Sequence, residues 1–243
     1  MLIGLTELKT YQVTSRGGEI GRVADVVFPR GEWVVRYIVV RSDELERKII
    51  LPCSCLEQAN RRKRLLEADV ERSQVEASPD LDLTKQIEHQ EEQDLYECYG
   101  WPPYWLQEEQ DVTPTGALSG EPEQTGGPDQ AEFSSPELQL ATDLVGAYAV
   151  HAHEGEFGVL QDIAVDDQTW MIPYLVVDAP AKHSCILVET DRVSEVDWVT
   201  KEVYVSLPAE TLLDSPVYHS QEPLTPELER SLHEYYDRIR RIT

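Results

Sequence analysis

The four cysteines are the first residues that could carry metal or redox chemistry, but their spacing fits neither. Cys53 and Cys55 lie two residues apart, which is not zinc-knuckle spacing, and no second cysteine pair follows them. An extended segment also places two such residues badly for a mutual disulfide. Cys98 and Cys185 stand alone. We predict reduced thiols in a cytoplasmic protein, with Cys53 and Cys55 buried for structural reasons.

Histidines provide the second candidate. His151 and His153 could hold a metal ion together with His183 or Glu154. Two histidines at this spacing are nevertheless common by chance, and we expect them to be surface residues of a turn.

Four acidic residues form two matched pairs, Glu19 with Glu156 and Asp25 with Asp162. They could relay protons, but a carboxylate beside a turn glycine usually accepts hydrogen bonds from local backbone amides or faces solvent, which we expect here. The sequence also lacks a convincing nucleophile with its base and a phosphate-binding loop. It therefore predicts a protein that is not an enzyme and that has no cofactor and no metal site.

These acidic pairs belong to an internal repeat in which residues match at an offset of 137. Ser78 and Pro79 match Ser215 and Pro216 at the same offset, so one unit of about 75 residues is used twice. The duplicated motif positions are Gly18, Glu19, Gly21, Asp25, Trp33 and Tyr37 in the first copy, and Gly155, Glu156, Gly158, Asp162, Trp170 and Tyr174 in the second.

The repeated unit has the sequence pattern of β-strands, because short runs rich in Val, Ile, Tyr and Trp alternate with turn residues. Strands are predicted in the first copy over residues 8–13, 20–28, 33–41 and 47–51, and in the second over 193–197 and 202–207. Gly18 and Gly155 suit the positive φ of a tight hairpin, and Gly21 and Gly158 suit a bulge inside a strand. We predict an all-β fold of two small antiparallel β-barrel modules.

The strings from Gly18 to Val27 and from Gly155 to Ala164, with the Trp-initiated strands after them, resemble the PRC-barrel family. That family includes the cytoplasmic domain of the photosynthetic reaction-centre H subunit and the C-terminal domain of a ribosome-maturation factor. The resemblance covers about 150 residues and implies a fold rather than a chemistry, because its motif consists of turn and core positions. This chain lacks the membrane helix of the first relative and the separate N-terminal domain of the second.

The predicted organisation has four parts: a first module at 1–79, an acidic linker at 80–143, a second module at 144–220 and a C-terminal helix at 221–243. Residues 82–96 suit a helix, and 113–136 are rich in Gly and Pro, as expected of a flexible tether. Thr225 and Pro226 fit the N-cap and first position of the last helix, whose apolar stripe we expect to cover a barrel.

An aromatic segment lies between the linker helix and the tether. We interpret it either as packing on this chain's own barrels or as a docking motif for another protein, since aromatic anchors often carry interface energy. The candidate docking residues are Tyr99, Trp101, Pro102, Pro103, Tyr104 and Trp105.

Charge limits the choice of partner. The formal net charge is −25, and the counts give +1 for residues 1–79, −15 for 80–143 and −11 for 144–243. Such a field makes direct nucleic-acid binding unfavourable, and no apolar run is long enough for membrane insertion. The basic cluster at 61–64 could contact rRNA or an acidic protein, but it more simply forms a solvated hairpin tip.

The sequence favours a non-catalytic, cytoplasmic adaptor or scaffold whose partner is another protein or a second copy. The family resemblance adds two alternatives: a ribosome or RNA-processing assembly factor that acts through protein contacts, and an accessory subunit in peripheral contact with an electron-transfer membrane complex.

Overall fold

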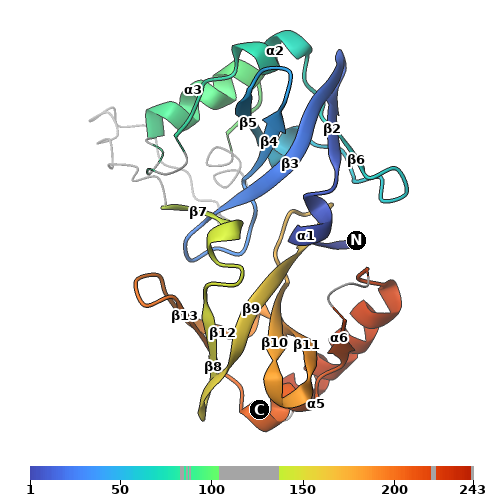
Figure 1. Cartoon of the computed structure of the whole chain (residues 1–243), viewed down its shortest axis with the longest axis vertical. Coiled ribbons are helices and arrows are strands. Elements are labelled where there is room, and N and C mark those ends of the chain that lie inside the picture. The colour runs from blue at the N-terminus through green and yellow to red at the C-terminus, as the bar shows by residue number, and fades with distance from the viewer. Residues whose placement is uncertain (83–84, 86, 88, 104–136, 220–222, 242–243) are drawn as a thin grey trace, which may run out of the picture.

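Two β-sheets stand one above the other in this chain and meet at a narrow waist (Figure 1). The computed structural model describes residues 1–82, 85, 87, 89–103, 137–219 and 223–241. Among the described helices, none is both long and apolar enough to span a membrane.

Each sheet is built around one strand of twelve residues. The first sheet has the order β5-β4-β3-β2-β6, with β7 (Leu138–Leu140) also on β3, and its other strands are β2 (Gln12–Ser15), β3 (Gly18–Pro29), β4 (Tyr37–Ser42), β5 (Arg47–Pro52) and β6 (Leu65–Glu67). The second has the order β12-β13-β8-β9-β10-β11-β14, with β1 (Leu2–Gly4) also on β9, and its other strands are β8 (Ala149–Ala152), β9 (Gly155–Asp166), β10 (Tyr174–Ala179), β11 (Ser184–Glu189), β12 (Val193–Asp197), β13 (Glu202–Val205) and β14 (Val217–Tyr218).

The mainly β fold agrees with the sequence prediction, but the predicted closed, purely antiparallel barrels are wrong. β2 pairs with β6 and β8 pairs with β13 in parallel, and over the described residues the strand order of each sheet is open. The reason is topological. After β5 or β11 the chain continues in the same direction and then reverses in a tight turn. The returning strand, β6 or β13, therefore runs beside β2 or β8 in the same direction as that strand.

The glycines inside the long strands sit at bulges, as the sequence predicts. Val13 pairs with Gly21 but Thr14 pairs with Glu19, which leaves Ile20 as the extra residue. The second sheet has the same bulge, because Val150 pairs with Gly158 and His151 pairs with Glu156. A Cβ atom on Gly21 would lie 2.1 Å from the carbonyl oxygen of Arg41, and one on Gly158 would lie 2.0 Å from that of Asp178. Neighbouring backbone therefore occupies the space that any side chain would need.

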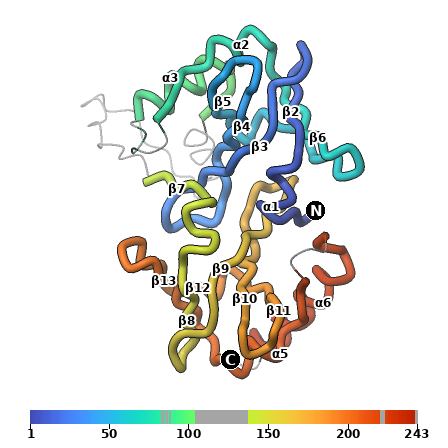
Figure 2. The backbone as a smooth tube through the Cα atoms, viewed as in Figure 1, coloured from blue at the N-terminus to red at the C-terminus, as the bar shows by residue number. Residues whose placement is uncertain are grey.

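The two halves exchange their leading strands. β1 leads the first half, within residues 1–103, but pairs with β9 of the second, and β7 leads the second half, within residues 137–241, but pairs with β3 of the first. The exchange is visible in the backbone trace, where the blue N-terminal segment lies against the yellow strand of the other half (Figure 2). Short helical turns follow both strands, namely α1 (Leu5–Leu8) and η2 (Ala141–Asp143).

The waist is nearly symmetric. Val34 and Met171, which match in the repeat, form an antiparallel bridge with each other. On either side of it the amide of Val35 donates to the carbonyl of Trp170 at 2.8 Å, and the amide of Ile172 donates to that of Trp33 at 2.7 Å. A two-fold relation between the halves explains why matched residues meet at this point.

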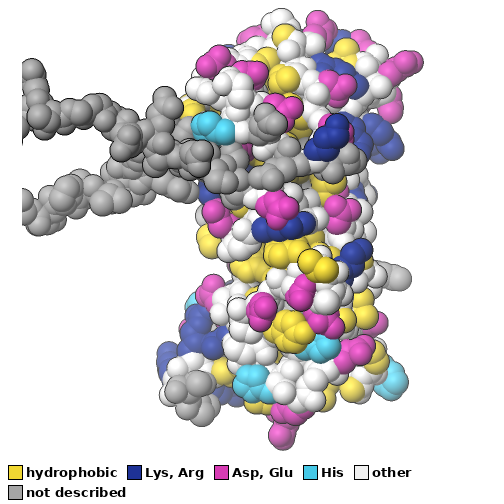
Figure 3. Space-filling model, turned by 90° about the vertical axis from the view of Figure 1, so that its left-hand side faces the viewer, with side chains coloured by type: hydrophobic (Ala, Val, Ile, Leu, Met, Phe, Trp, Pro, Cys, Tyr) yellow, Lys and Arg dark blue, Asp and Glu magenta, His cyan; other side chains and the backbone are white. Residues whose placement is uncertain are grey.

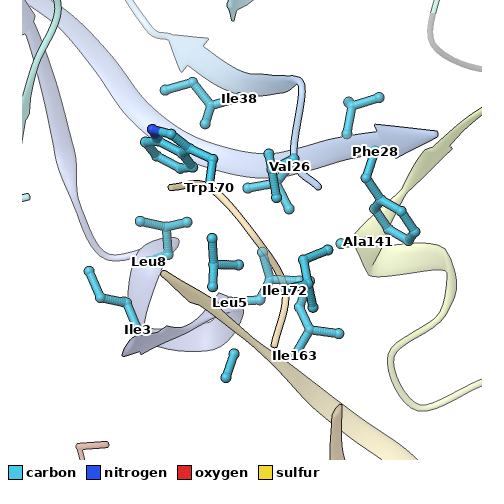
Figure 4. Packing of buried hydrophobic residues seen from close by; sticks show 14 of the residues in the cluster. Ile3, Leu5, Leu8, Val26, Phe28, Ile38, Ala141, Ile163, Trp170 and Ile172 are labelled. Carbon is cyan, nitrogen blue, oxygen red and sulfur yellow. The ribbon is translucent and has the colours of Figure 1, made fainter. Parts of the chain in front are cut away.

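Apolar side chains from both halves fill the space around this bridge. Figure 4 shows Leu5 and Val26 of the first half beside Ile163 and Ile172 of the second. All four are buried, with at most 2 % of each exposed. The hydrophobic core therefore runs through the waist without a break, and its burial stabilises the association of the halves.

The repeat also includes helices, which sequence matching did not detect. α2 (Arg72–Ala77) and α5 (Ala209–Asp214) lie 137 positions apart, and so do the buried pairs Leu95/Leu232 and Tyr99/Tyr236 of α3 (His89–Tyr99) and α6 (Pro226–Arg240). The linker helix and the C-terminal helix are thus counterparts that cover equivalent faces of the two sheets (Figure 1).

Several predicted elements are displaced. The strand expected over 8–13 is β2, which begins only at Gln12, because the chain first forms the helical turn α1. β4 begins at Tyr37 rather than at Trp33, because residues 33–35 hydrogen-bond across the waist instead. The linker helix covers 89–99 rather than 82–96. The C-terminal helix is placed as predicted, and the Thr225 hydroxyl accepts from the Leu228 amide at 3.3 Å.

Candidate interaction surface

The aromatic segment begins inside the molecule. Leu95, Tyr96 and Tyr99 of α3 are buried against the first sheet, and the Tyr96 ring lies 6.0 Å from the ring of Tyr37. The Tyr37 hydroxyl donates to Oε1 of buried Glu92 at 2.5 Å. Burial raises the pKa of Tyr37, and its phenol remains protonated. These contacts fix α3 on this chain's own sheet, so Tyr99 is not accessible to a partner.

The segment leaves the sheet directly after Tyr99. Gly100 has φ +68°, its amide donates to the carbonyl of Glu97, and the Trp101 amide donates to that of Tyr96, which together form a Schellman motif. α6 continues through the equivalent positions as a helix. Trp101 and Pro103 are half-buried and Pro102 is exposed, while the predicted Tyr104 and Trp105 lie outside the described residues.

A cavity of about 300 Å³ opens beside this exit, and both halves of the chain border it. The first half contributes Cys53 and Ser54 near the end of β5, the second half contributes Trp170, and Pro102 stands at the rim. Trp170 has φ +58° and is 7 % exposed, so its ring is fixed in the waist. Backbone strain of this kind persists where surrounding contacts enforce it.

The duplicated aspartates join the halves. The Asp25 carboxylate accepts from its neighbour's amide at 2.9 Å and from the Thr142 amide of the other half at 3.2 Å. Asp162 does the same with the Ile163 amide at 2.8 Å and the Thr6 amide at 3.2 Å. Burial raises the pKa of both carboxyls, against the lowering effect of these hydrogen bonds.

The other duplicated residues divide between core and surface. Tyr37 and Tyr174 are buried, and burial raises the pKa of Tyr174 to about 12, with nearby Glu189 adding to the rise. Glu19 and Glu156 are exposed beside the hairpin glycines Gly18 and Gly155, whose φ values are +123° and +127°. Trp33 is half-exposed at the waist and stacks on Phe28 with ring centroids 5.8 Å apart.

His151 lies on β8 and is half-buried, not in a surface turn as expected. His151 stacks on Tyr204 with ring centroids 5.0 Å apart and lies 3.5 Å from a Glu202 oxygen, while His153 and His183 are exposed. Among the described residues, no three His, Cys, Asp or Glu side chains are grouped as metal ligands would be.

The basic tip at 61–64 is partly used inside the chain. Arg61 pairs with Glu7 at 2.6 Å and donates to the Leu224 carbonyl at 2.8 Å, which links it to the segment before α6. Arg62, Lys63 and Arg64 are exposed. The sequence singled out this cluster but carried no signal for its contact with Glu7.

The cysteines differ in accessibility, and this predicts their reactivity. Cys53, Cys55 and Cys185 are buried, and Cys98 is half-buried. Burial raises the pKa of Cys53, brings that of Cys55 to about 12, and also raises that of Cys98. Because the thiolate is the reactive form, we expect an aromatic disulfide reagent at pH 8 to label Cys98 first and Cys53 and Cys55 only on unfolding. Rapid labelling of more than one thiol in the native protein would contradict this.

No protein-family model matches this sequence, and no curated protein is significantly similar to it. A function must therefore be inferred from the surface itself. The sequence did not predict three features of this region: the exchanged strands β1 and β7, the Val34–Met171 bridge, and the position of Pro102 beside the cavity.

Proposed function

We propose that this chain is a non-catalytic adaptor that binds another protein at its waist and is built from two units related to the PRC-barrel family. One observation carries the proposal: α3 is buried, yet the helix ends at Gly100 and the next residues place Pro102 at a cavity that both halves border. Half-buried Trp101 precedes Pro102 in the chain. α6, the counterpart of α3, has no such exit. A rigid proline segment beside an aromatic residue is suited to recognition at low entropic cost.

The proposal places the protein in the cytoplasm, where buried and reduced thiols are stable. The family resemblance suggests two classes of partner, a ribosomal assembly intermediate and a membrane electron-transfer complex. The acidic field favours protein surfaces of these particles over their RNA or lipid.

The test is crosslinking in the native cell followed by mass spectrometry, with the intact chain compared with a Trp101→Ala/Pro102→Ala variant. Because neither side chain is fully buried, we expect the variant to keep its melting temperature within about 3 °C while the crosslinked partner is lost. Val199→Ala is the matched control, since Val199 is 91 % exposed on the β12–β13 turn. Equal recovery of the partner from the variant, or self-crosslinks alone from the intact chain, would contradict the docking role.

A further inference from the structure

A second groove lies at the waist, between the turn after β3 and strand β12. It has a volume of about 220 Å³, and described residues from both halves line it. Phe28 and Trp33 stack on one side, and Trp198 stands on the other with the Arg30 guanidinium 4.9 Å above its ring. Figure 3 views the molecule from the side of β12 and β13 and shows hydrophobic side chains gathered across the waist between charged ones.

This groove runs along the edge of a sheet. Residues 193–196 all line it, and because successive side chains of a strand point to opposite faces, a cavity that borders four in a row follows the strand's edge. β12 pairs with β13 and is the terminal strand of its sheet over the described residues. Such an edge presents backbone donors and acceptors that can pair with an added strand.

The equivalent edge of the first half borders the cavity beside Pro102, but it has one contact with the other half that β12 lacks. At the offset of 137, Ala59 corresponds to Val196, and the Ala59 amide donates to the Asp167 carboxylate of the other half at 3.2 Å. The residue equivalent to Asp167 is Arg30, whose side chain has no acceptor atom and lies over Trp198 instead. The departure from two-fold symmetry therefore removes this side-chain acceptor from the β12 edge, and the groove separates that edge from residues 31–33 of the other half.

Charge indicates the occupant. Glu32 and Glu195 are exposed and line the groove, and the surrounding second half is strongly acidic. Glu32 already pairs with Arg36 at 2.8 Å, so Glu195 is the carboxylate that a basic ligand would meet. A second copy of this chain, with its net charge of −25, would be repelled. We infer that the groove binds an extended, basic segment of a partner protein, which adds a strand to β12, places an apolar side chain between Trp33 and Trp198, and sets Lys or Arg against Glu195. This inference rests on the proposed adaptor function and names a second contact for it.

The test uses the full chain and a fluorescein-labelled peptide of alternating lysine and valine with a central tryptophan, measured by fluorescence anisotropy. We expect saturable binding with a Kd below about 100 μM in low salt, weakened at least about tenfold by Glu195→Lys or by Trp198→Ala. The same peptide with alternate amides N-methylated keeps its charge but cannot add a strand, and should also bind at least about tenfold more weakly. Val199→Ala should bind like the intact chain.

Three outcomes would overturn the inference. The first is an N-methylated peptide that binds as well as its parent, because charge alone would then explain the affinity. The second is equal binding of a glutamate–valine peptide, and the third is no saturation up to about 1 mM. If the peptide fails to bind but the Trp101→Ala/Pro102→Ala variant loses its cellular partner, only the groove inference is wrong. If the peptide binds as expected but that variant keeps its cellular partner, the docking role of residues 101–102 is wrong.

Discussion

Replacing Gly21 by valine should destabilise the first half of the chain by about 3 kcal/mol or more, and Gly158→Val should do the same to the second. The added Cβ atoms would lie 2.1 Å and 2.0 Å from the carbonyl oxygens of Arg41 and Asp178, and these belong to paired strands that cannot move aside. Urea unfolding followed by circular dichroism measures the effect.

Gly31→Ala separates crowding from backbone strain. Gly31 has φ +88°, but nothing lies within 4 Å of the position that an added methyl group would occupy, so this variant should cost only about 1 to 2 kcal/mol. Equal stability of Gly21→Val and the intact chain would show that β3 has no such bulge. Because the halves share a core, we also expect Gly21→Val to lower the unfolding midpoint of the second half.

Replacing Asp25 by alanine should cost about 2 kcal/mol or more, whereas Asp25→Asn should be at least as stable as the intact chain near pH 7. Alanine leaves the amides of Val26 and Thr142 without their acceptor, while asparagine retains an oxygen for both and removes a buried charge. Urea unfolding of the two variants in parallel gives the comparison.

The pH dependence provides an independent check on Asp25. Burial holds its pKa in the folded state above the ordinary value of 3.8, so the folded state binds the proton more readily than the unfolded chain. Its contribution to stability is therefore greatest in acid and is lost as pH rises from about 3.8 through the raised pKa. The advantage of Asp25→Asn should grow over that window and then stay constant. An advantage that shrinks as pH rises would contradict the raised pKa.

The sequence predicts the sheets and their bulges because those signals are local. Gly21 and Gly158 recur at the same offset among β-branched residues, and both backbone crowding and hairpin geometry act within a few residues of them. The C-terminal helix is equally clear, since Thr225 and Pro226 mark its start.

The waist could not be predicted because its contacts join residues far apart in the chain. β1 is three residues long and has no strand signature of its own, and nothing local indicates that it pairs with β9 rather than with its own half.

The equivalence of α3 and α6 was missed for another reason: Leu95/Leu232 and Tyr99/Tyr236 match, but the exposed faces between them differ. The sequence also singles out the aromatic segment as a candidate docking motif, but its division between buried Tyr99 and half-buried Trp101 depends on the turn at Gly100.

Both proposed contacts exist only if the halves remain joined, and native-state hydrogen exchange tests this most directly. The amides of Val35 and Ile172 are the two that cross the waist beside the Val34–Met171 bridge. If the halves form one interlocked body, these amides should be protected to within about tenfold of the amides in the β4 and β10 ladders. Exchange about a hundredfold faster than in those ladders would show that the halves separate while each sheet stays folded, and would contradict a waist that holds the halves together.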